Sequence, residues 1–160
     1  MDQFTFHQIN NKDKTQIPYD LLLLADETEE AINKYISNCE VYLLIQNGQR
    51  IGVIALHKNT DTELEIKNMA IIDRYRNKGL GSILINKAKE MAKENHYSSL
   101  LVGTSDTGFQ QIRFYEKNGF IKKEIRKDFF IKNYPAPVFE NGLQMKDMIV
   151  LEFLIHYFPE

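Results

Sequence analysis

The chain has 160 residues, of which 43% are hydrophobic and 26% are charged, and its formal net charge is −2 at pH 7. This length is enough for a domain with a buried core, and the composition is that of an ordinary globular protein. The near-neutral charge argues against a nucleic-acid-binding protein, and the apolar run at residues 21–25 is far too short to span a membrane. We therefore expect one domain over residues 1–160, with neither nucleic acid nor a membrane as partner.

Cysteine and histidine indicate neither disulfide nor metal chemistry. The one cysteine, Cys39, cannot form an internal disulfide, and beside a strand it is more typical of a small buried apolar residue than of a nucleophile. The histidines, at positions 7, 57, 96 and 156, lack the spacing of metal ligands, so we expect no metal. Residues 1–10 lack the basic start and apolar core of a signal peptide, which together with Cys39 predicts a cytoplasmic protein.

Apolar periodicity and turn residues predict the elements along the chain. Apolar segments between turn signals predict strands, at residues 4–9, 41–45, 51–56, 63–72, 98–103, 120–130 and 145–154. Apolar spacings of three and four predict helices, two short ones beginning near Pro18 and Asp26 and two longer ones at 79–95 and 108–118. This order predicts an α/β or α+β fold, in which one sheet carries helices on both faces.

Local signals predict turns and helix ends. Asn47-Gly48 between two strands is typical of a tight hairpin turn. Asp26, followed three residues later by Glu29, has the spacing of a capping box at the start of a helix. Gly119 fits the left-handed residue that ends a helix, and Pro135-Ala136-Pro137 indicates a stiff excursion in the last hairpin.

A glycine turn of the pattern R-x-x-G-x-G, from Arg76 to Gly81, is the most informative stretch of the chain. Glycines at a helix start leave backbone N–H groups bare, which makes an anion site suited to phosphate or pyrophosphate. The three-glycine dinucleotide fingerprint is incomplete here, and the Gly-Lys-Ser/Thr of phosphate-loop NTPases is absent. The simpler interpretation is a tight turn without a ligand.

Three features together resemble the GNAT superfamily of acyl-CoA N-acetyltransferases. The turn Arg76-Asn77-Lys78-Gly79-Leu80-Gly81, after a strand that ends Met69-Ala70-Ile71, is similar to the family's pyrophosphate loop. The segment Phe114-Tyr115-Glu116-Lys117-Asn118-Gly119-Phe120 is similar to the ending of the family's last major helix. The order of elements also matches, and the C-terminal third looks like small bacterial members of the YvbK type. The resemblance implies a single domain with a mixed, mostly antiparallel central sheet.

The resemblance also implies acetyl-CoA as cosubstrate, with direct transfer of its acetyl group to an amine. In this fold the strand before the turn splays from its neighbour, so its free backbone groups can pair with the pantetheine arm. The turn binds the pyrophosphate through backbone donors, the helix dipole and cations. The implied cofactor-binding residues are Met69, Ala70, Ile71, Arg76, Asn77, Lys78, Gly79, Leu80, Gly81 and Ser82. For Arg76 and Lys78 the alternative is a solvated surface charge.

Two side chains are implied for catalysis. Tyr115 matches the family tyrosine near the sulfur, and a phenol, with an ordinary pKa near ~10, can act as general acid to the CoA thiolate. Glu65 lies eleven residues before Arg76, where several members carry a glutamate, and is the candidate general base, acting via water. Strand alternation places it on one face with Glu63 and Lys67. The alternatives are a packed aromatic ring for Tyr115 and a solvent-facing strand residue for Glu65.

In this family the loop between the first two helices and the last hairpin often build the acceptor wall. The implied candidates are Leu24, Asp26 and Glu27 on one side and Asp128, Phe129, Tyr134, Glu140, Asn141 and Asp147 on the other. Acids there favour a cationic amine, although Asp26 also fits a helix cap and Asn141-Gly142 also fits a turn. The asparagine by which many members contact the cofactor falls on Gly108 here, where the candidate substitutes are Thr104, Ser105 and Asp106.

The leading functional prediction is acetyl transfer to a primary amine of a small molecule. Two alternatives stay open: acetylation of a protein lysine or N-terminus, and a non-catalytic acyl-CoA-binding sensor, which would need neither Tyr115 nor Glu65. The apolar tail Phe153–Phe158 fits an edge strand, so a homodimer through the C-terminal strands is a further expectation.

Overall fold

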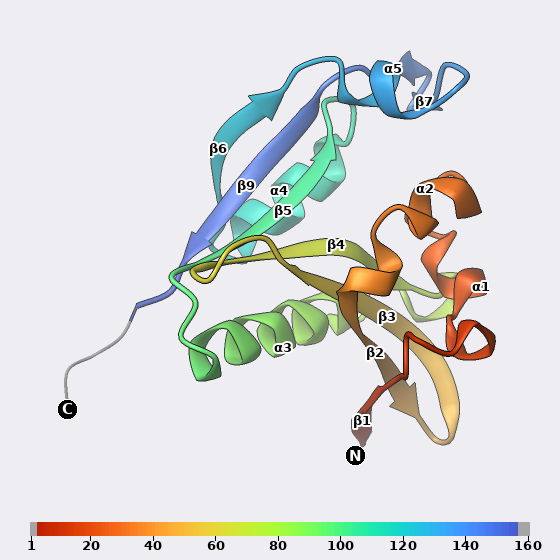
Figure 1. Ribbon diagram of the computed structural model, residues 1–160, viewed down its shortest axis with the longest axis vertical. Coiled ribbons are helices and arrows are strands. Elements are labelled where there is room, and N and C mark those ends of the chain that lie inside the picture. Colours follow the sequence, from red (N-terminus) through yellow and green to blue (C-terminus); the bar gives the residue numbers. More distant parts are fainter. Residues whose placement is uncertain (1–2, 157–160) are drawn as a thin grey trace.

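Seven strands form one sheet in the computed structural model, which describes residues 3–156 (Figure 1). The strand order is β1–β2–β3–β4–β5–β9–β6, and every neighbouring pair is antiparallel except β4 and β5, which are parallel. The strands are β1 (Phe4–Gln8), β2 (Cys39–Gln46), β3 (Gln49–Lys58), β4 (Glu63–Ile71), β5 (Ser99–Ser105), β6 (Ile121–Arg126) and β9 (Met148–Leu154), and a separate hairpin pairs β7 (Phe139–Glu140) with β8 (Leu143–Gln144). The predicted mixed, mostly antiparallel sheet is confirmed.

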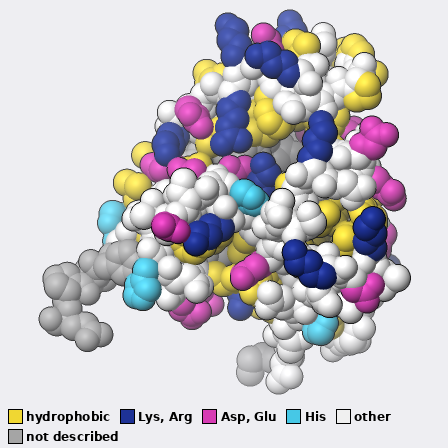
Figure 2. Space-filling model, in the orientation of Figure 1, with side chains coloured by type: hydrophobic (Ala, Val, Ile, Leu, Met, Phe, Trp, Pro, Cys, Tyr) yellow, Lys and Arg dark blue, Asp and Glu magenta, His cyan; other side chains and the backbone are white. Residues whose placement is uncertain are grey.

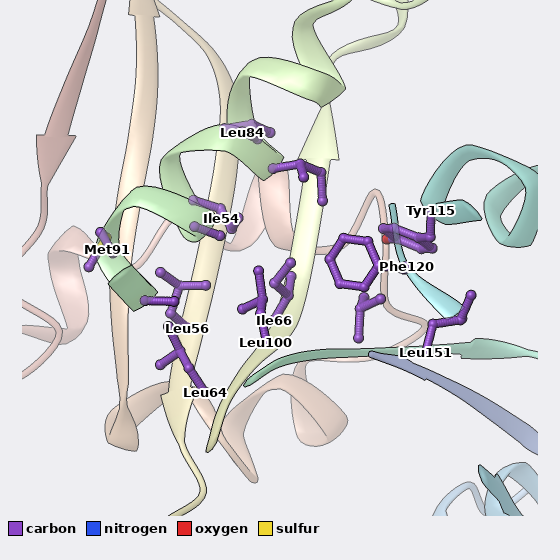
Figure 3. Close-up of a cluster of buried hydrophobic side chains, with 14 of the residues drawn as sticks. Ile54, Leu56, Leu64, Ile66, Leu84, Met91, Leu100, Tyr115, Phe120 and Leu151 are labelled. Carbon is purple, nitrogen blue, oxygen red and sulfur yellow. The ribbon is translucent and has the colours of Figure 1, made fainter. Parts of the chain in front are cut away.

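Helices cover both faces of this sheet. They are α1 (Tyr19–Leu22), α2 (Glu29–Asn33), α3 (Leu80–Glu94), α4 (Phe109–Lys117) and α5 (Phe129–Asn133), with short 3₁₀ helices at Lys14–Gln16, Ile36–Asn38 and Asp73–Tyr75. Successive residues of β3 reach opposite cores, because side chains alternate along a strand. Ile54 belongs to a buried cluster that includes Leu84 of α3 and Ile112 of α4, as Figure 3 shows in part, whereas Val53 belongs to a second cluster that includes Leu22 of α1. None of the described helices is long and apolar enough to cross a membrane.

The predicted hairpin turn and the ends of the two long helices are confirmed. Asn47 and Gly48 have φ of 51° and 75°, and a type I′ turn requires positive φ at both positions. Helix α3 begins after Gly79 and ends before Asn95, and Gly119, with φ of 93°, follows α4. These features depend on neighbouring residues alone, so the local sequence was sufficient to predict them.

The predicted cap of α2 is wrong. Thr28, not Asp26, is the N-cap, because the Thr28 side-chain oxygen accepts a hydrogen bond from the backbone N–H of Ala31 at 3.1 Å. Threonine directly before a helix is itself a good cap. The Asp26 carboxylate is therefore available for contacts with distant parts of the chain.

We expect Thr28→Ala to lower the free energy of unfolding by about 1 kcal/mol, because α2 loses the partner of one N–H group in its first turn. Urea denaturation of the variant beside the wild type measures the change. Thr28→Ser keeps the acceptor oxygen and should restore most of the stability. An unchanged midpoint in Thr28→Ala would contradict the cap.

The chain after β6 also departs from the prediction. The predicted strand 120–130 is wrong beyond Arg126, because Asp128 takes a left-handed φ of 56° and α5 follows it. The rings of Phe129, Phe130 and Tyr134 pack on one another, with centroids 5.1 and 5.7 Å apart. This packing favours a helical turn over extended chain.

Strand β9 lies inside the sheet, between β5 and β6. The predicted edge strand at 153–158 is therefore wrong for Phe153 and Leu154, which pair with β5; residues 157 and 158 lie outside the described residues. The C-terminal edge of the sheet is β6, where Ile121 and Ile125 are 60% and 63% exposed. The homodimer through the C-terminal strands stays a prediction.

Candidate active site

Strands β4 and β5 diverge, and the divergence opens a cavity. They pair only between Glu63–Ile66 and Ser99–Val102, so no described strand covers the β5-facing side of residues 67–71. A cavity of about 1020 Å³ lies there, lined by β4, β5, α3, α4, α5 and the loop after α1. Figure 1 shows α1 and α2 on one side of the opening and α5 on the other. Figure 2 shows the surface hollowed between these parts, with charged side chains of both signs around the hollow.

The glycine turn lies along this cavity. Gly79, with φ of 80°, is the N-cap of α3, and no described side chain caps the helix, which leaves the N–H groups of its first turn for a ligand. Gly81 lies so close to Phe114 that an added Cβ would meet the ring at 2.9 Å. Arg76 lines the cavity and is fixed by Asp73 at 3.1 Å and by the backbone oxygen of Ile71 at 3.3 Å. This arrangement fits an anion such as pyrophosphate.

Most of the residues predicted to bind the cofactor line the cavity. They are Met69, Ala70, Ile71, Arg76, Asn77, Gly79, Leu80, Gly81 and Ser82. Lys78 is outside the lining, and its Nζ lies 5.4 Å from the centroid of the Tyr75 ring. The backbone of residues 69–71 pairs with β3 on one side only, so the other side can receive an extended ligand as an added strand.

Tyr115 presents an unused hydroxyl to the cavity. Its ring packs edge-to-face on Phe114 and Phe120, with centroids 5.3 and 5.8 Å away, and Figure 3 shows it beside Phe120. Burial raises the pKa of Tyr115 to about 12, so the phenol stays protonated near neutral pH. Tyr115 lines the cavity, and no described residue forms a hydrogen bond with its hydroxyl. The proton is therefore available to a ligand.

Glu65 is buried among polar partners and does not face solvent. Its exposed fraction is 4%. Oε1 accepts from Asn59 at 2.9 Å and Arg126 at 3.3 Å, and Oε2 lies 3.2 Å from Lys67 Nζ. Burial pushes the pKa of Glu65 upward, but the three partners outweigh it, and the pKa falls below the ordinary carboxyl value. A carboxylate with a lowered pKa and bonded oxygens is a weak proton acceptor.

We expect Glu65→Gln to destabilise the fold at pH 7 and to flatten the acid side of its stability profile. Because the pKa is lowered, ionised Glu65 stabilises the fold above the ordinary carboxyl pKa of about 4.3, and this contribution is lost as the pH falls through the folded-state pKa. The loss at pH 7 should be about 1–3 kcal/mol, the usual cost of removing a charged hydrogen-bond partner. Urea denaturation of both proteins from neutral to acid pH measures it, and parallel profiles would contradict this role.

The loop after α1 and the helix α5 meet across the cavity. Asp26 Oδ1 accepts from the Tyr134 hydroxyl at 2.6 Å, and Oδ2 accepts from the Tyr35 hydroxyl at 3.0 Å. Lys34 Nζ donates to the backbone oxygen of Asn133 at 3.1 Å. Burial and the Asp26 charge raise the pKa of both tyrosines, so both remain donors. These contacts form a bridge over one end of the cavity.

Two residues that line this end, Tyr35 and Asn68, were not predicted from the sequence, and Lys67 beside them had no predicted role. Asn68 Nδ2 donates to the Tyr35 hydroxyl at 3.0 Å and to the backbone oxygen of Leu22 at 2.9 Å. Lys67 Nζ lies 5.6 Å from the centroid of the Tyr35 ring. Two successive polar residues inside an apolar strand were a usable signal, because buried polar groups need partners.

The hairpin β7–β8 contributes Glu140 to the predicted wall. Glu140 lines the cavity, and its Oε1 accepts from Ser105 Oγ at 2.7 Å and Thr107 Oγ1 at 3.2 Å. A Cβ at Gly108 would meet Thr104 Oγ1 at 2.8 Å, so this position has no room for an asparagine side chain. Polar groups at the start of α4 therefore come from the neighbouring segments.

The other predicted wall residues fall into two groups. Those that line the cavity are Leu24, Asp26, Glu27, Phe129 and Tyr134. Asp128, Asn141 and Asp147 are outside the lining. The backbone N–H of Asp128 donates to Asp147 at 2.9 Å, and Asn141 donates to the backbone of Thr107 at 3.0 Å. These three residues shape the loops beside the cavity.

The cysteine and the candidate metal-ligating residues lie as follows in the described part of the chain. Cys39 is buried, and burial raises the pKa of its thiol to about 12, so the thiol is unreactive at neutral pH. Within residues 3–156, no group of three or more His, Cys, Asp and Glu side chains is arranged to hold a metal ion.

Comparison with known proteins shows extensive similarity to one family. The profile of the Acetyltransferase (GNAT) family matches residues 6–120. The N-acetyltransferase YvbK of Bacillus subtilis is 35% identical over 133 residues, which cover 83% of this chain and 86% of YvbK. A GNAT family acetyltransferase from Elizabethkingia anophelis, solved with acetyl-CoA bound, gives a TM-score of 0.90 at 39% identity over 96% of this chain and 99% of that chain. The structure of the IAA acetyltransferase from Bacillus cereus gives a TM-score of 0.87 at 35% identity, over 95% of this chain and 99% of that chain.

Proposed function

Because this chain belongs to the GNAT family and is an acetyl-CoA-dependent N-acetyltransferase, we propose that it acetylates a primary amine of a small molecule. The observation that carries the proposal is the cavity between β4 and β5, which joins the glycine turn, Tyr115 and the tyrosine-lined end in one space. The related protein from Bacillus cereus is likewise named for a small acceptor, IAA.

The residues present fit acetyl-CoA, which supplies the activated acetyl thioester. The bare N–H groups of α3 and the guanidinium of Arg76 suit the pyrophosphate, since both offer positive charge to an anion. The unpaired backbone of residues 69–71 suits the amides of the pantetheine arm. Because Gly81 has no side chain, the start of α3 can lie close to the ring of Phe114.

Tyr115 is proposed to act on the departing sulfur. Its pKa of about 12 exceeds the ordinary thiol pKa of about 8.5, so its main effect is a hydrogen bond that stabilises the thiolate as the C–S bond breaks. In apolar surroundings such a bond is stronger than in water, because the local dielectric is low.

Glu65 is better suited to positioning than to the predicted role of general base via water. Its pKa is lowered and both oxygens are occupied, so we assign to it the task of fixing Lys67 and Arg126. The amine loses its proton to solvent, which costs about 4.6 kcal/mol at pH 7 for an amine of pKa ~10.4. The neutral nitrogen then bonds to the acetyl carbon, the C–S bond breaks to release the CoA thiolate, and the nitrogen gives up its second proton to solvent as it becomes an amide.

The bridge over the cavity favours a small acceptor over a protein one. The Tyr134–Asp26 and Lys34–Asn133 hydrogen bonds would have to break to admit a polypeptide segment. A non-catalytic acyl-CoA sensor would have no use for the open hydroxyl of Tyr115.

Titration calorimetry with acetyl-CoA and desulfo-CoA, followed by free-thiol release with amines, amino acids and peptides, tests this function. We expect acetyl-CoA to bind and thiol release to depend on a small amine. No binding at millimolar acetyl-CoA would overturn the cosubstrate assignment. Binding with transfer to peptides alone would overturn the small acceptor.

A further inference from the structure

The acceptor end of the cavity carries a cation with unused donors. Lys67 Nζ has three N–H groups, and its one ion pair within residues 3–156 is to Glu65 Oε2, at 3.2 Å. The Lys67 side chain is 25% exposed and lines the cavity. Glu65 is also bound by Arg126 and Asn59, which fixes the carboxylate and hence the position of the lysine. The remaining N–H groups of Lys67 are available to an anionic group in the cavity.

The same end carries a carboxylate with an unused acceptor position. A carboxylate can accept about four hydrogen bonds. Asp26 Oδ1 accepts from the backbone N–H of Glu27 at 2.7 Å and from Tyr134 at 2.6 Å, and Oδ2 accepts from Tyr35 at 3.0 Å. One position on Oδ2 therefore has no partner among the described residues. An amine N–H is a suitable donor for it.

Tyr35 contacts both of these groups. Lys67 lies over its ring and Asp26 is bonded to its hydroxyl. Asn68 is bonded to the same hydroxyl, and its Oδ1 is the one buried side-chain oxygen or nitrogen in residues 3–156 that lacks a hydrogen-bond partner. These residues all line the same cavity, so the unused donors of Lys67 and the unused acceptor position of Asp26 belong to one site.

Resting on the function proposed above, we propose that the acceptor is a small free amino acid. Its carboxylate pairs with Lys67, and its amino group donates to Asp26, with the nitrogen lone pair left for the acetyl carbon. A diamine fits less well, because its second cation would approach the Lys67 ammonium without compensation. A peptide N-terminus fits less well, because its carboxylate has been replaced by an amide.

The test compares each amino acid with its own carboxamide, which has the same shape but no negative charge. Free-thiol release gives kcat/KM for acids from glycine to 6-aminohexanoate, for leucine and for phenylalanine, with 1,4-diaminobutane and butylamine alongside. Each value is referred to the concentration of unprotonated amine, because a carboxamide lowers the pKa of the neighbouring amino group. The best acid should exceed its amide by about 10- to 100-fold, the usual weight of a charged hydrogen bond. A ratio near one, or a preference for the diamine, would overturn the proposal.

Variants then test whether Lys67 is the residue that causes the preference for an acid over its amide. Lys67→Met should bring the acid-to-amide ratio close to one, and Lys67→Arg should keep it. Lys132→Met is the matched control, because Lys132 lies on α5 beside the cavity but outside its lining, and it should leave the ratio unchanged. Asp26→Asn should lower kcat/KM for acids and amides alike, because both carry the amine. A ratio that survives in Lys67→Met would overturn the assignment.

A further measurement keeps the proposal testable without variants, and the outcomes separate it from the proposed function. If Lys67→Met does not fold, calorimetric titration of the wild-type complex with CoA by the best acid and its amide gives the same comparison without a variant, and equal affinities would overturn the proposal. If acetyl-CoA does not bind, or no amine is acetylated, the proposed function itself fails. If amines are acetylated but acids are not preferred over their amides, only the proposal of an amino acid as acceptor is overturned.

Discussion

Tyr115→Phe should lower kcat by about 10²- to 10³-fold, the usual effect of removing a hydrogen-bond donor that stabilises negative charge in the transition state. The Kd for acetyl-CoA should hardly change, because the ring that packs on Phe114 and Phe120 is retained. Stability should be equal or slightly higher, since the lost hydroxyl has no described partner. Free-thiol release and calorimetric titration of one preparation separate the two constants.

Tyr75→Phe is the matched control for this variant. Tyr75 also lines the cavity, but its hydroxyl donates to Gln49 at 3.4 Å. We expect its kcat to stay within a few-fold of the wild type. If Tyr115→Phe turned over at the wild-type rate, the thiolate would have to be stabilised by another group.

Gly79→Asp should weaken acetyl-CoA binding at least about 10-fold relative to Gly79→Asn, because a carboxylate at the N-terminus of α3 repels the pyrophosphate. The two side chains have nearly the same size, and both tolerate the left-handed φ of 80° better than most residues do. No atom lies within 4 Å of an added Cβ, so the fold has room for either. The comparison therefore isolates the charge.

Calorimetric titration of both Gly79 variants at low and high salt checks this expectation. The difference in Kd should narrow as salt rises, because an exposed charge is screened. Equal affinities at low salt would show that the pyrophosphate does not bind at this helix end.

The features that the sequence predicted correctly depend on short-range patterns. Asn47-Gly48 specifies its hairpin, and Gly79 opens a helix whose buried face follows the apolar spacing. The alternation of Glu65 and Lys67 placed both on one face of β4, where they form an ion pair.

The features that the sequence did not predict depend on contacts between distant segments. The Asp26–Tyr134 hydrogen bond joins residues 108 positions apart, and no local pattern marks either as the partner of the other. Asp26 resembled a helix cap because Glu29 stood at the right spacing, but Thr28 was closer to the helix. Likewise, the burial that raises the pKa of Tyr115 depends on a core that also contains Ile66, Leu84 and Leu151, which only the folded chain brings together.

Because β4 and β5 pair over only four residues each, the sheet consists of two halves that are joined by a short paired segment. Strands β5, β9 and β6 form one half, and β1 to β4 form the other. A cosubstrate that pairs with β4 along the gap acts as the missing strand, so its binding energy also holds the halves together. Ligand at 100 times its Kd adds about 2.7 kcal/mol to the free energy of unfolding. Bound acetyl-CoA would thus tie the two halves of the sheet together, so that the enzyme resists unfolding more strongly as its cosubstrate becomes abundant.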